Sequence, residues 1–191
     1  MATEKLYDLW AKRSPQWEKR YEDSLLKTFC DYGRGETSLR EARGKLFGAG
    51  YELYIIAFFI GLYYGQRRPL NEDNQKRKDF GWAIKNWGNI EQRLGRKPYP
   101  KICEYLFVAL IAKTDFDFIA LEKGETTPRK AVDMLIQTME EYANWGFHFM
   151  EDKLSDDSNY FYKETAFLEV FLSFDATVNP TTSDDEPESL D

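Results

Sequence analysis

Basic and aromatic side chains are interleaved in one part of the chain, residues 67–101. Lysine and arginine can contact phosphates, and exposed aromatic rings can stack on unpaired bases. The residues that we expect to contact a partner are Arg67, Arg68, Lys76, Arg77, Lys78, Trp82, Lys85, Trp87, Arg93, Arg96, Lys97 and Lys101. This pattern predicts a surface for an anionic partner, either a nucleic acid or a protein. The alternative is a solvated loop whose bases pair with the protein's own acids and whose aromatic rings fill the core.

The distribution of charge supports a partner surface. Residues 67–101 contain ten bases and four acids, whereas residues 175–191 contain six acids and no base. The whole chain has a net charge of −7, so the part before residue 175 is almost neutral. Such an asymmetry is typical of a protein that meets a charged partner. The acidic segment either keeps the chain in solution or competes for the basic surface.

Residues with an obvious catalytic role are scarce. The chain has no glycine-rich phosphate loop and no nucleophile motif of the α/β-hydrolases. Its single histidine, His148, cannot form the usual zinc site with several histidines. Cys30 and Cys103 lie in apolar patterns, where cysteine acts as a small core residue. We therefore predict no catalytic residue, no metal and no cofactor.

Carboxylates leave one enzymatic alternative open, because a pair of them can hydrolyse a glycosidic bond without any other motif. The candidates are Asp115, Asp117, Glu122, Glu140, Glu141 and Glu164. Asp115 and Asp117 would point in different directions on a helix, and Asp115 is suited to cap a helix after Thr114. A small carboxylate-based hydrolase is thus the enzymatic alternative to a non-catalytic protein.

Helices must position these residues. Apolar side chains lie all round residues 51–64, which predicts a central buried helix that ends at Gly65. Residues 102–112 form a second strongly apolar helix, and residues 160–174 a last one that buries Phe167, Leu168, Phe171 and Leu172.

Two further helix starts are marked by a cap followed by proline, at Ser14-Pro15 and at Thr127-Pro128. After the first, a spacing of four predicts that one helix face buries Trp17, Tyr21, Leu25 and Phe29. Another helix is expected from Ser38, and no segment alternates as a strand does. The fold class is therefore all-α. We expect one compact domain, residues 1–174, of seven or eight helices around 51–64 and 102–112, followed by a flexible acidic tail, residues 175–191.

The expected location is the cytoplasm. The cysteines have no close partner in sequence, residues 1–13 lack the apolar core of a secretory signal, and the longest apolar run is shorter than a bilayer requires. We expect no membrane contact. The predicted function is that of a non-catalytic accessory subunit that binds a protein or nucleic acid through residues 67–101, as in a DNA-processing or defence assembly. A structural homo-oligomer held by surplus aromatic surface is the other non-catalytic alternative.

Overall fold

The computed structural model describes residues 5–30, 45–89 and 97–178, with side chains up to Leu172. The protein is mainly helical, as predicted. Its helices are α1 (Leu6–Ala11), α2 (Lys27–Phe29), α4 (Gly50–Tyr64), α5 (Ile102–Lys113), α6 (Phe118–Glu122), α7 (Pro128–Asp156) and α8 (Ala166–Val178). Shorter elements are β1 (Gln16–Glu18), β2 (Arg77–Asp79), a π-helical turn (Glu22–Leu26) and three 3₁₀ turns (Asn74–Lys76, Ile84–Asn86 and Tyr160–Tyr162).

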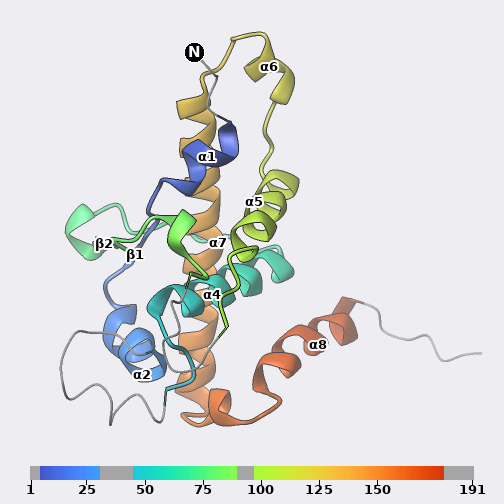
Figure 1. Ribbon diagram of the computed structural model, residues 1–191. Coiled ribbons are helices and arrows are strands. Elements are labelled where there is room, and N and C mark those ends of the chain that lie inside the picture. Colours follow the sequence, from blue (N-terminus) through green and yellow to red (C-terminus); the bar gives the residue numbers. More distant parts are fainter. Residues whose placement is uncertain (1–4, 31–44, 90–96, 179–191) are drawn as a thin grey trace, which may run out of the picture.

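Helix α7 is the long axis on which α1, α4, α5 and β1 pack, whereas α8 contacts α4 (Figure 1). It begins as predicted, because the hydroxyl of Thr127 accepts a hydrogen bond from the backbone N–H of Lys130 at 3.2 Å and Pro128 occupies the first turn. Helix α7 buries one face that includes Leu135, Met139 and Tyr142. Helices α1, α4 and α5 and strand β1 all contact it.

Helix α4 crosses α7 so closely that the two backbones touch. A Cβ atom added at Gly61 would lie 2.1 Å from the carbonyl oxygen of Tyr142, and one added at Gly146 would lie 1.9 Å from that of Ala57. The two glycines thus remove the side chains that would hold the helices apart. Helix α4 is buried over most of its surface and ends at Gly65, as predicted.

The segment after Ser14-Pro15 is not the helix that the cap-proline motif predicted. Its first residues form β1, which pairs antiparallel with β2 and places Trp17 opposite Lys78. The carboxylate of Glu140 also accepts a bond from the backbone N–H of Gln16 at 2.7 Å. These long-range partners outweigh local helix propensity. The predicted burial is nevertheless confirmed, because the apolar residues spaced by four are all buried: Trp17, Tyr21, Leu25 and Phe29.

The structure shows which faces of two other helices are buried. Helix α5 forms as expected and is buried on one face, through Cys103, Leu106 and Leu110, whereas Tyr105 and Val108 are exposed. In α8, Leu168 and Leu172 were predicted to be buried, yet each is 58% exposed. Composition predicted these helices, but it could not determine which faces have neighbours.

Helix α8 continues to Val178 and so includes residues 175–178 of the expected tail. The remainder of that tail and the helix expected from Ser38 to Leu46 fall mostly or wholly outside the described residues. Within residues 5–30, 45–89 and 97–178, no helix combines the length and apolar character that a membrane crossing requires.

Candidate interaction surface

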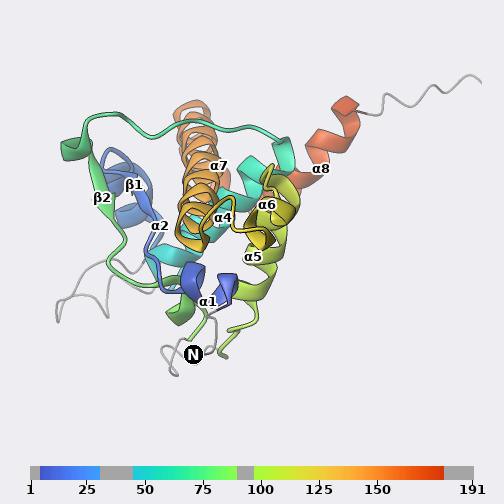
Figure 2. The same cartoon turned by 90° about the horizontal axis from the view of Figure 1, so that it is seen from above.

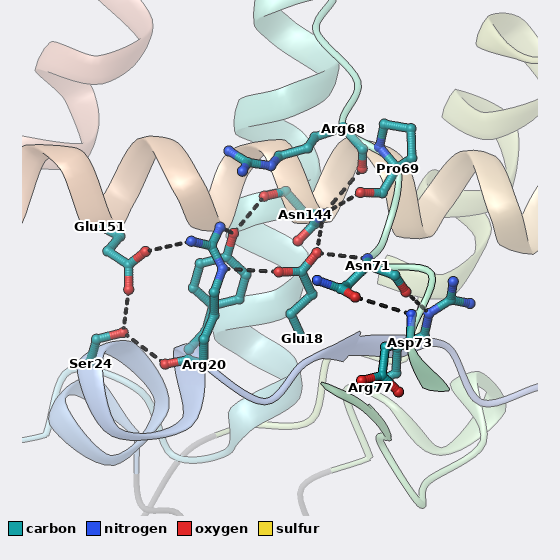
Figure 3. A network of polar contacts seen from close by, with 11 residues as sticks. Glu18, Arg20, Ser24, Arg68, Pro69, Asn71, Asp73, Arg77, Asn144 and Glu151 are labelled. Carbon is teal, nitrogen blue, oxygen red and sulfur yellow. Dashed lines mark hydrogen bonds and ion pairs between the residues drawn. The ribbon is translucent and has the colours of Figure 1, made fainter. Parts of the chain in front are cut away.

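The first part of the basic segment is anchored to α7 by a buried polar network (Figure 3). The side-chain amide of Asn144 donates to Glu18 Oε1 at 3.1 Å and to the carbonyl oxygens of Arg68 at 3.2 Å and Pro69 at 3.0 Å. Glu18 Oε1 also accepts from the backbone N–H of Asn71 at 2.9 Å. The segment that follows α4 is therefore fixed between β1 and α7.

Arg20 connects this network to Glu151, near the C-terminal end of α7. Its guanidinium donates to Glu18 Oε2 at 2.9 Å, lies 3.4 Å from Glu151 Oε2 and bonds the hydroxyl of Tyr21. Glu151 also accepts from the Ser24 hydroxyl at 2.8 Å. Desolvation by burial, partly opposed by Arg20, raises the pKa of Tyr21, so its phenol remains a neutral donor and acceptor.

The chain nearest to this network is held within the molecule through the backbone of Arg68 and the side chain of Arg67. Figure 2 shows the segment after α4 passing alongside α7 towards β2. Within it, the backbone N–H of Arg68 donates to the carbonyl of Glu141 at 3.0 Å. Arg67 donates to the carbonyl of Lys113 at 2.6 Å, and its guanidinium lies 4.8 Å from the ring centre of Tyr142.

The bases of residues 76–78, in and next to β2, are also partly bound within the molecule. Arg77 donates to the carbonyl of Asn71, and Lys78 forms an ion pair with Glu22 at 3.1 Å. Lys76 is exposed and lines a shallow pocket of about 220 Å³ together with Glu18. Lys78 therefore pairs with an acid, as the alternative foresaw, whereas Arg67 and Arg77 donate to backbone carbonyls.

The later part of the segment presents a different surface, formed by residues 80–89 and 97–101. The ring of Trp87 is fully buried and lies 5.7 Å from that of Tyr51 at an interplanar angle of 14°. The ring of Trp82 lies 6.0 Å from that of Tyr51 at an interplanar angle of 31° and is 49% exposed. Trp87 is therefore a core residue, and Trp82 is the exposed member of this group of three rings.

Trp82 is held in place through its backbone. Its carbonyl oxygen accepts bonds from the hydroxyl of Ser14 and from the indole N–H of Trp87, both at 3.3 Å. The two parts of this surface are joined by a hydrogen bond from the N–H of Tyr99 to the carbonyl of Gly88 at 2.8 Å. The exposed ring is thus presented on a fixed support.

Three predicted lysines, Lys85, Lys97 and Lys101, are exposed on these same two stretches. Residues 80–89 and 97–103 contain these three bases and no acid. We call Trp82, Lys85, Lys97 and Lys101 the lysine–tryptophan surface. The predicted site residues Arg93 and Arg96 lie outside the described residues.

None of the candidate carboxylates lines the pockets of about 390, 640 and 220 Å³ among the described residues. Pockets of about 640 Å³ and 220 Å³ contain one carboxylate each, Glu52 and Glu18, and neither was among the candidates. Asp117, rather than Asp115, caps α6 by accepting from the N–H of Ala120 at 2.9 Å. Burial raises the pKa of Glu140 to about 7, but this carboxylate accepts a bond from the backbone of β1.

Two other residues considered for catalysis, His148 and Cys103, make contacts within the fold. His148 lies 3.5 Å from Asp152 on the same helix, and Cys103 is buried, with its thiol 3.1 Å from the carbonyl of Ile84. No group of three or more potential metal ligands occurs among the residues that the structure describes.

Sequence reasoning missed Glu18 and Asn144, which hold the basic segment, and the pair formed by Glu52 and Tyr99. Glu18 and Asn144 are far apart in the chain, and neither belongs to a motif. The only signal was an isolated polar residue on the apolar face of a helix, as for Asn144 in α7 and Glu52 in α4.

Comparison with known proteins gave no match to a family model, to a curated protein or to a solved structure.

Proposed function

We propose that the protein is a non-catalytic interaction protein that binds single-stranded nucleic acid through the lysine–tryptophan surface. The observation that carries the proposal is the half-exposed ring of Trp82, which packs against Tyr51, itself stacked on the buried Trp87. An unpaired base can stack on the Trp82 ring, since base–aromatic stacking is tolerant of sequence.

Charge supports the same partner. Lys85, Lys97 and Lys101 are exposed, and residues 80–89 and 97–103 contain no acid. Lysines on such a surface can contact phosphates and release counterions, which favours binding at low salt. In this proposal Arg68 and Lys76 contact the backbone of a longer strand, whereas Arg67, Arg77 and Lys78, which are bound internally, add only to the electrostatic attraction. Such a protein would serve as an accessory subunit of a DNA-processing or defence assembly.

The direct test is fluorescence anisotropy with a labelled oligothymidine of about 12 nucleotides, titrated at several salt concentrations from about 50 mM. Replacing Lys85, Lys97 and Lys101 by alanine should lower the affinity and reduce the slope of log K against log salt by about 2, at roughly 0.7 per lost phosphate contact. The matched control replaces Lys123, Arg129 and Lys130, which are exposed near the start of α7. It changes the net charge equally and should leave the slope almost unchanged.

A separate variant tests whether a base stacks on the ring of Trp82. Trp82→Ala should cost about 1–3 kcal/mol of binding free energy. Tyr162→Ala, which removes another ring that is 49% exposed, should not weaken binding. Absence of binding by the wild-type protein at about 50 mM salt would overturn the nucleic-acid proposal, and binding of an acidic polypeptide alone would reassign the surface to a protein partner.

A specific observation favours the homo-oligomer as a second candidate. Large apolar side chains are exposed on neighbouring elements: Tyr105 and Val108 on α5, and Phe118 and Ile119 on α6. Val108 and Phe118 also line an apolar hollow of about 390 Å³ beside α1. Light scattering should then show a dimer or higher oligomer that Val108→Glu dissociates, and a monomeric wild-type protein would contradict it.

A further inference from the structure

Two lysines lie opposite each other at one end of the β1–β2 pair. The register that pairs Glu18 with Arg77 continues by one residue, because the backbone N–H of Lys19 donates to the carbonyl of Lys76 at 2.9 Å. Both lysine side chains are exposed, and neither forms an ion pair with an acid within residues 5–30, 45–89 and 97–178. Like charges directly opposite each other on neighbouring strands are destabilising. An anion bound between these two lysines would remove the repulsion.

Both lysines line the pocket of about 220 Å³, which also contains two side-chain amides. The pocket is lined by Glu18, Lys19, Arg20, Asn71, Gln75 and Lys76. The side-chain oxygen of Asn71 accepts a bond from the backbone N–H of Asp73 at 3.0 Å, which leaves the N–H₂ group of Asn71 as a donor. Gln75 is exposed and brings a second amide. The pocket therefore combines two ammonium groups with neutral N–H donors.

Glu18 is the one acid that lines this pocket among the described residues, and its oxygens already have donors (Figure 3). Oε2 accepts from Arg20 at 2.9 Å, and Oε1 accepts from the amide of Asn144 at 3.1 Å and from the backbone N–H of Asn71 at 2.9 Å. Glu151 also pairs with Arg20, at 3.4 Å, and does not line the pocket. The charge of Arg20 is therefore committed to these two acids.

The neighbouring acids do not neutralise the two lysines either. Glu22 forms an ion pair with Lys78 at 3.1 Å. Asp73 caps the short turn that follows it, and Glu72 is exposed without lining the pocket. The positive charge that remains in the pocket is that of the two lysines.

A phosphate monoester has three strong acceptor oxygens and a charge of about −1.5 to −2 at pH 7. We propose that this pocket binds a phosphomonoester group, whose oxygens accept bonds from Lys19, Lys76 and the amides of Asn71 and Gln75. A phosphodiester has a smaller charge and fewer free oxygens, so it satisfies fewer of these donors. The phosphomonoester belongs either to a small phosphorylated molecule or to the phosphorylated end of a nucleic-acid strand, and the experiment distinguishes these sources.

The wild-type protein tests the ligand chemistry by calorimetric titration with methyl phosphate and dimethyl phosphate, in a buffer free of phosphate at about 50 mM salt. Methyl phosphate should bind about tenfold more tightly, because it has more charge and one more oxygen for charge-assisted hydrogen bonds. Absence of methyl phosphate binding, or equal affinity for the two esters, would overturn the proposal.

Variants of the two lysines locate the site. Lys19→Gln and Lys76→Gln should each weaken methyl phosphate about five- to tenfold. Without ligand, neither variant should lower the midpoint of urea unfolding, because each removes a repulsion between like charges. Lys123→Gln, at an exposed position after α6, is the matched control and should leave the affinity unchanged. Unchanged affinity in both pocket variants would place the phosphate elsewhere and refute the site.

A variant of Gln75 tests the same pocket without removing a lysine. Gln75→Glu keeps the shape of this exposed side chain but places a carboxylate beside the two lysines, so it should weaken methyl phosphate more than tenfold. Gln66→Glu, at an exposed position after α4, changes the net charge equally and should have almost no effect. Equal losses in these two variants would show that net charge, rather than the pocket, determines binding.

Oligothymidines of about 12 nucleotides with a phosphate at the 5′ end, at the 3′ end or at neither end distinguish the sources. If the pocket holds a strand end, one phosphorylated form should bind more tightly, and the advantage should disappear when Lys19 and Lys76 are both replaced by glutamine. Equal binding of all three, with methyl phosphate still bound, would assign the pocket to a small phosphorylated molecule.

This inference goes beyond the nucleic-acid proposal and can fail separately from it, because methyl phosphate requires no oligonucleotide and Trp82 does not line the pocket. Trp82→Ala should therefore retain methyl phosphate binding while weakening every oligothymidine. Binding of methyl phosphate without binding of any oligothymidine would support the pocket and overturn only the nucleic-acid proposal.

Discussion

Asn144 shows how one amide can determine the path of a basic segment. Its amide nitrogen lies within hydrogen-bond distance of three acceptors, the carboxylate of Glu18 and the carbonyls of Arg68 and Pro69. Since all three can only accept, the amide must present its N–H₂ group to them. The local sequence could not have predicted this contact, because its partners are more than 70 residues away.

The first prediction concerns this amide. Asn144→Asp preserves the shape of the side chain but places an acceptor against three acceptors, so it should lower the free energy of unfolding by about 2–4 kcal/mol. The control is Asn159→Asp at an exposed position, which should change stability by less than about 0.5 kcal/mol. Urea denaturation compares the two, and equal stability would show that the network does not hold the segment.

A second prediction at the residue scale concerns Glu140. Burial raises the pKa of this carboxyl group to about 7. The hydrogen bond from Gln16 and the charges of Arg77 and Arg13 oppose the shift, and Asp79 adds to it. The unfolded chain ionises this group near the ordinary value, so the folded state holds the proton more tightly and loses stability as pH rises through about 4.5 to 7.

Glu140→Gln should therefore be more stable than the wild type by about 1–3 kcal/mol at pH 8, with the gain shrinking towards pH 5. The variant still accepts the bond from Gln16. Thermal unfolding at both pH values measures the difference, and Glu122→Gln at an exposed position reports the effect of removing one negative charge. A gain that is the same at both pH values would contradict the assigned shift.

At the scale of elements, the crossing of α4 and α7 depends on the absence of two side chains. Gly61→Ala would place a Cβ 2.1 Å from the Tyr142 carbonyl, and Gly146→Ala one 1.9 Å from the Ala57 carbonyl. Backbone cannot yield as a flexible side chain does, so each variant should cost about 3 kcal/mol or more. Gly65→Ala is the control, because it meets no atom within 4 Å and is strained only by its φ of +63°. It should cost about 1 kcal/mol, and equal losses in all three variants would refute the crossing.

Capping residues and apolar periodicity predicted the helices that are determined by neighbouring residues in the sequence. The cap at Thr127 and the stop at Gly65 were correct, and so was the helical nature of residues 51–64 and 102–112. The β1–β2 pair was missed, because its two strands lie about 60 residues apart in the chain. Leu168 and Leu172 of α8 were wrongly predicted to be buried for a related reason, since apolar content does not reveal which faces have a neighbour.

The same limit applies to the candidate site. The alternation of bases and aromatic rings predicted a partner surface in residues 67–101. Only long-range contacts, however, determine which of these bases are bound internally and which are exposed. Lys78 is paired with Glu22, whereas Lys85 is exposed, and nothing in their immediate sequence distinguishes them. Trp82 and Trp87 likewise share a segment and both contact Tyr51 of α4, but only Trp87 is also packed against Tyr54 and Phe80, and only Trp87 is buried.

At the scale of the whole molecule, the net charge of −7 opposes the approach of a polyanion to the lysine–tryptophan surface. The tail was expected to begin at residue 175, but α8 extends to Val178, so a truncation that spares the helix must begin at Asn179. Residues 179–191 carry five acids and no base, and their removal changes the net charge to −2.

Deleting residues 179–191 should therefore strengthen oligothymidine binding by about three- to tenfold at about 50 mM salt, and much less at about 200 mM, because screening shortens the range of repulsion between surface charges. A full-length control with Asn at Asp184, Asp185 and Asp191 and Gln at Glu186 and Glu188 separates charge from length. If the acids compete with the nucleic acid, the neutralised chain should bind as tightly as the truncated one in anisotropy titrations. Binding that improves only on truncation would instead show that the segment obstructs the surface by its bulk, and an unchanged affinity in both would show that the acidic tail does not oppose the lysine–tryptophan surface.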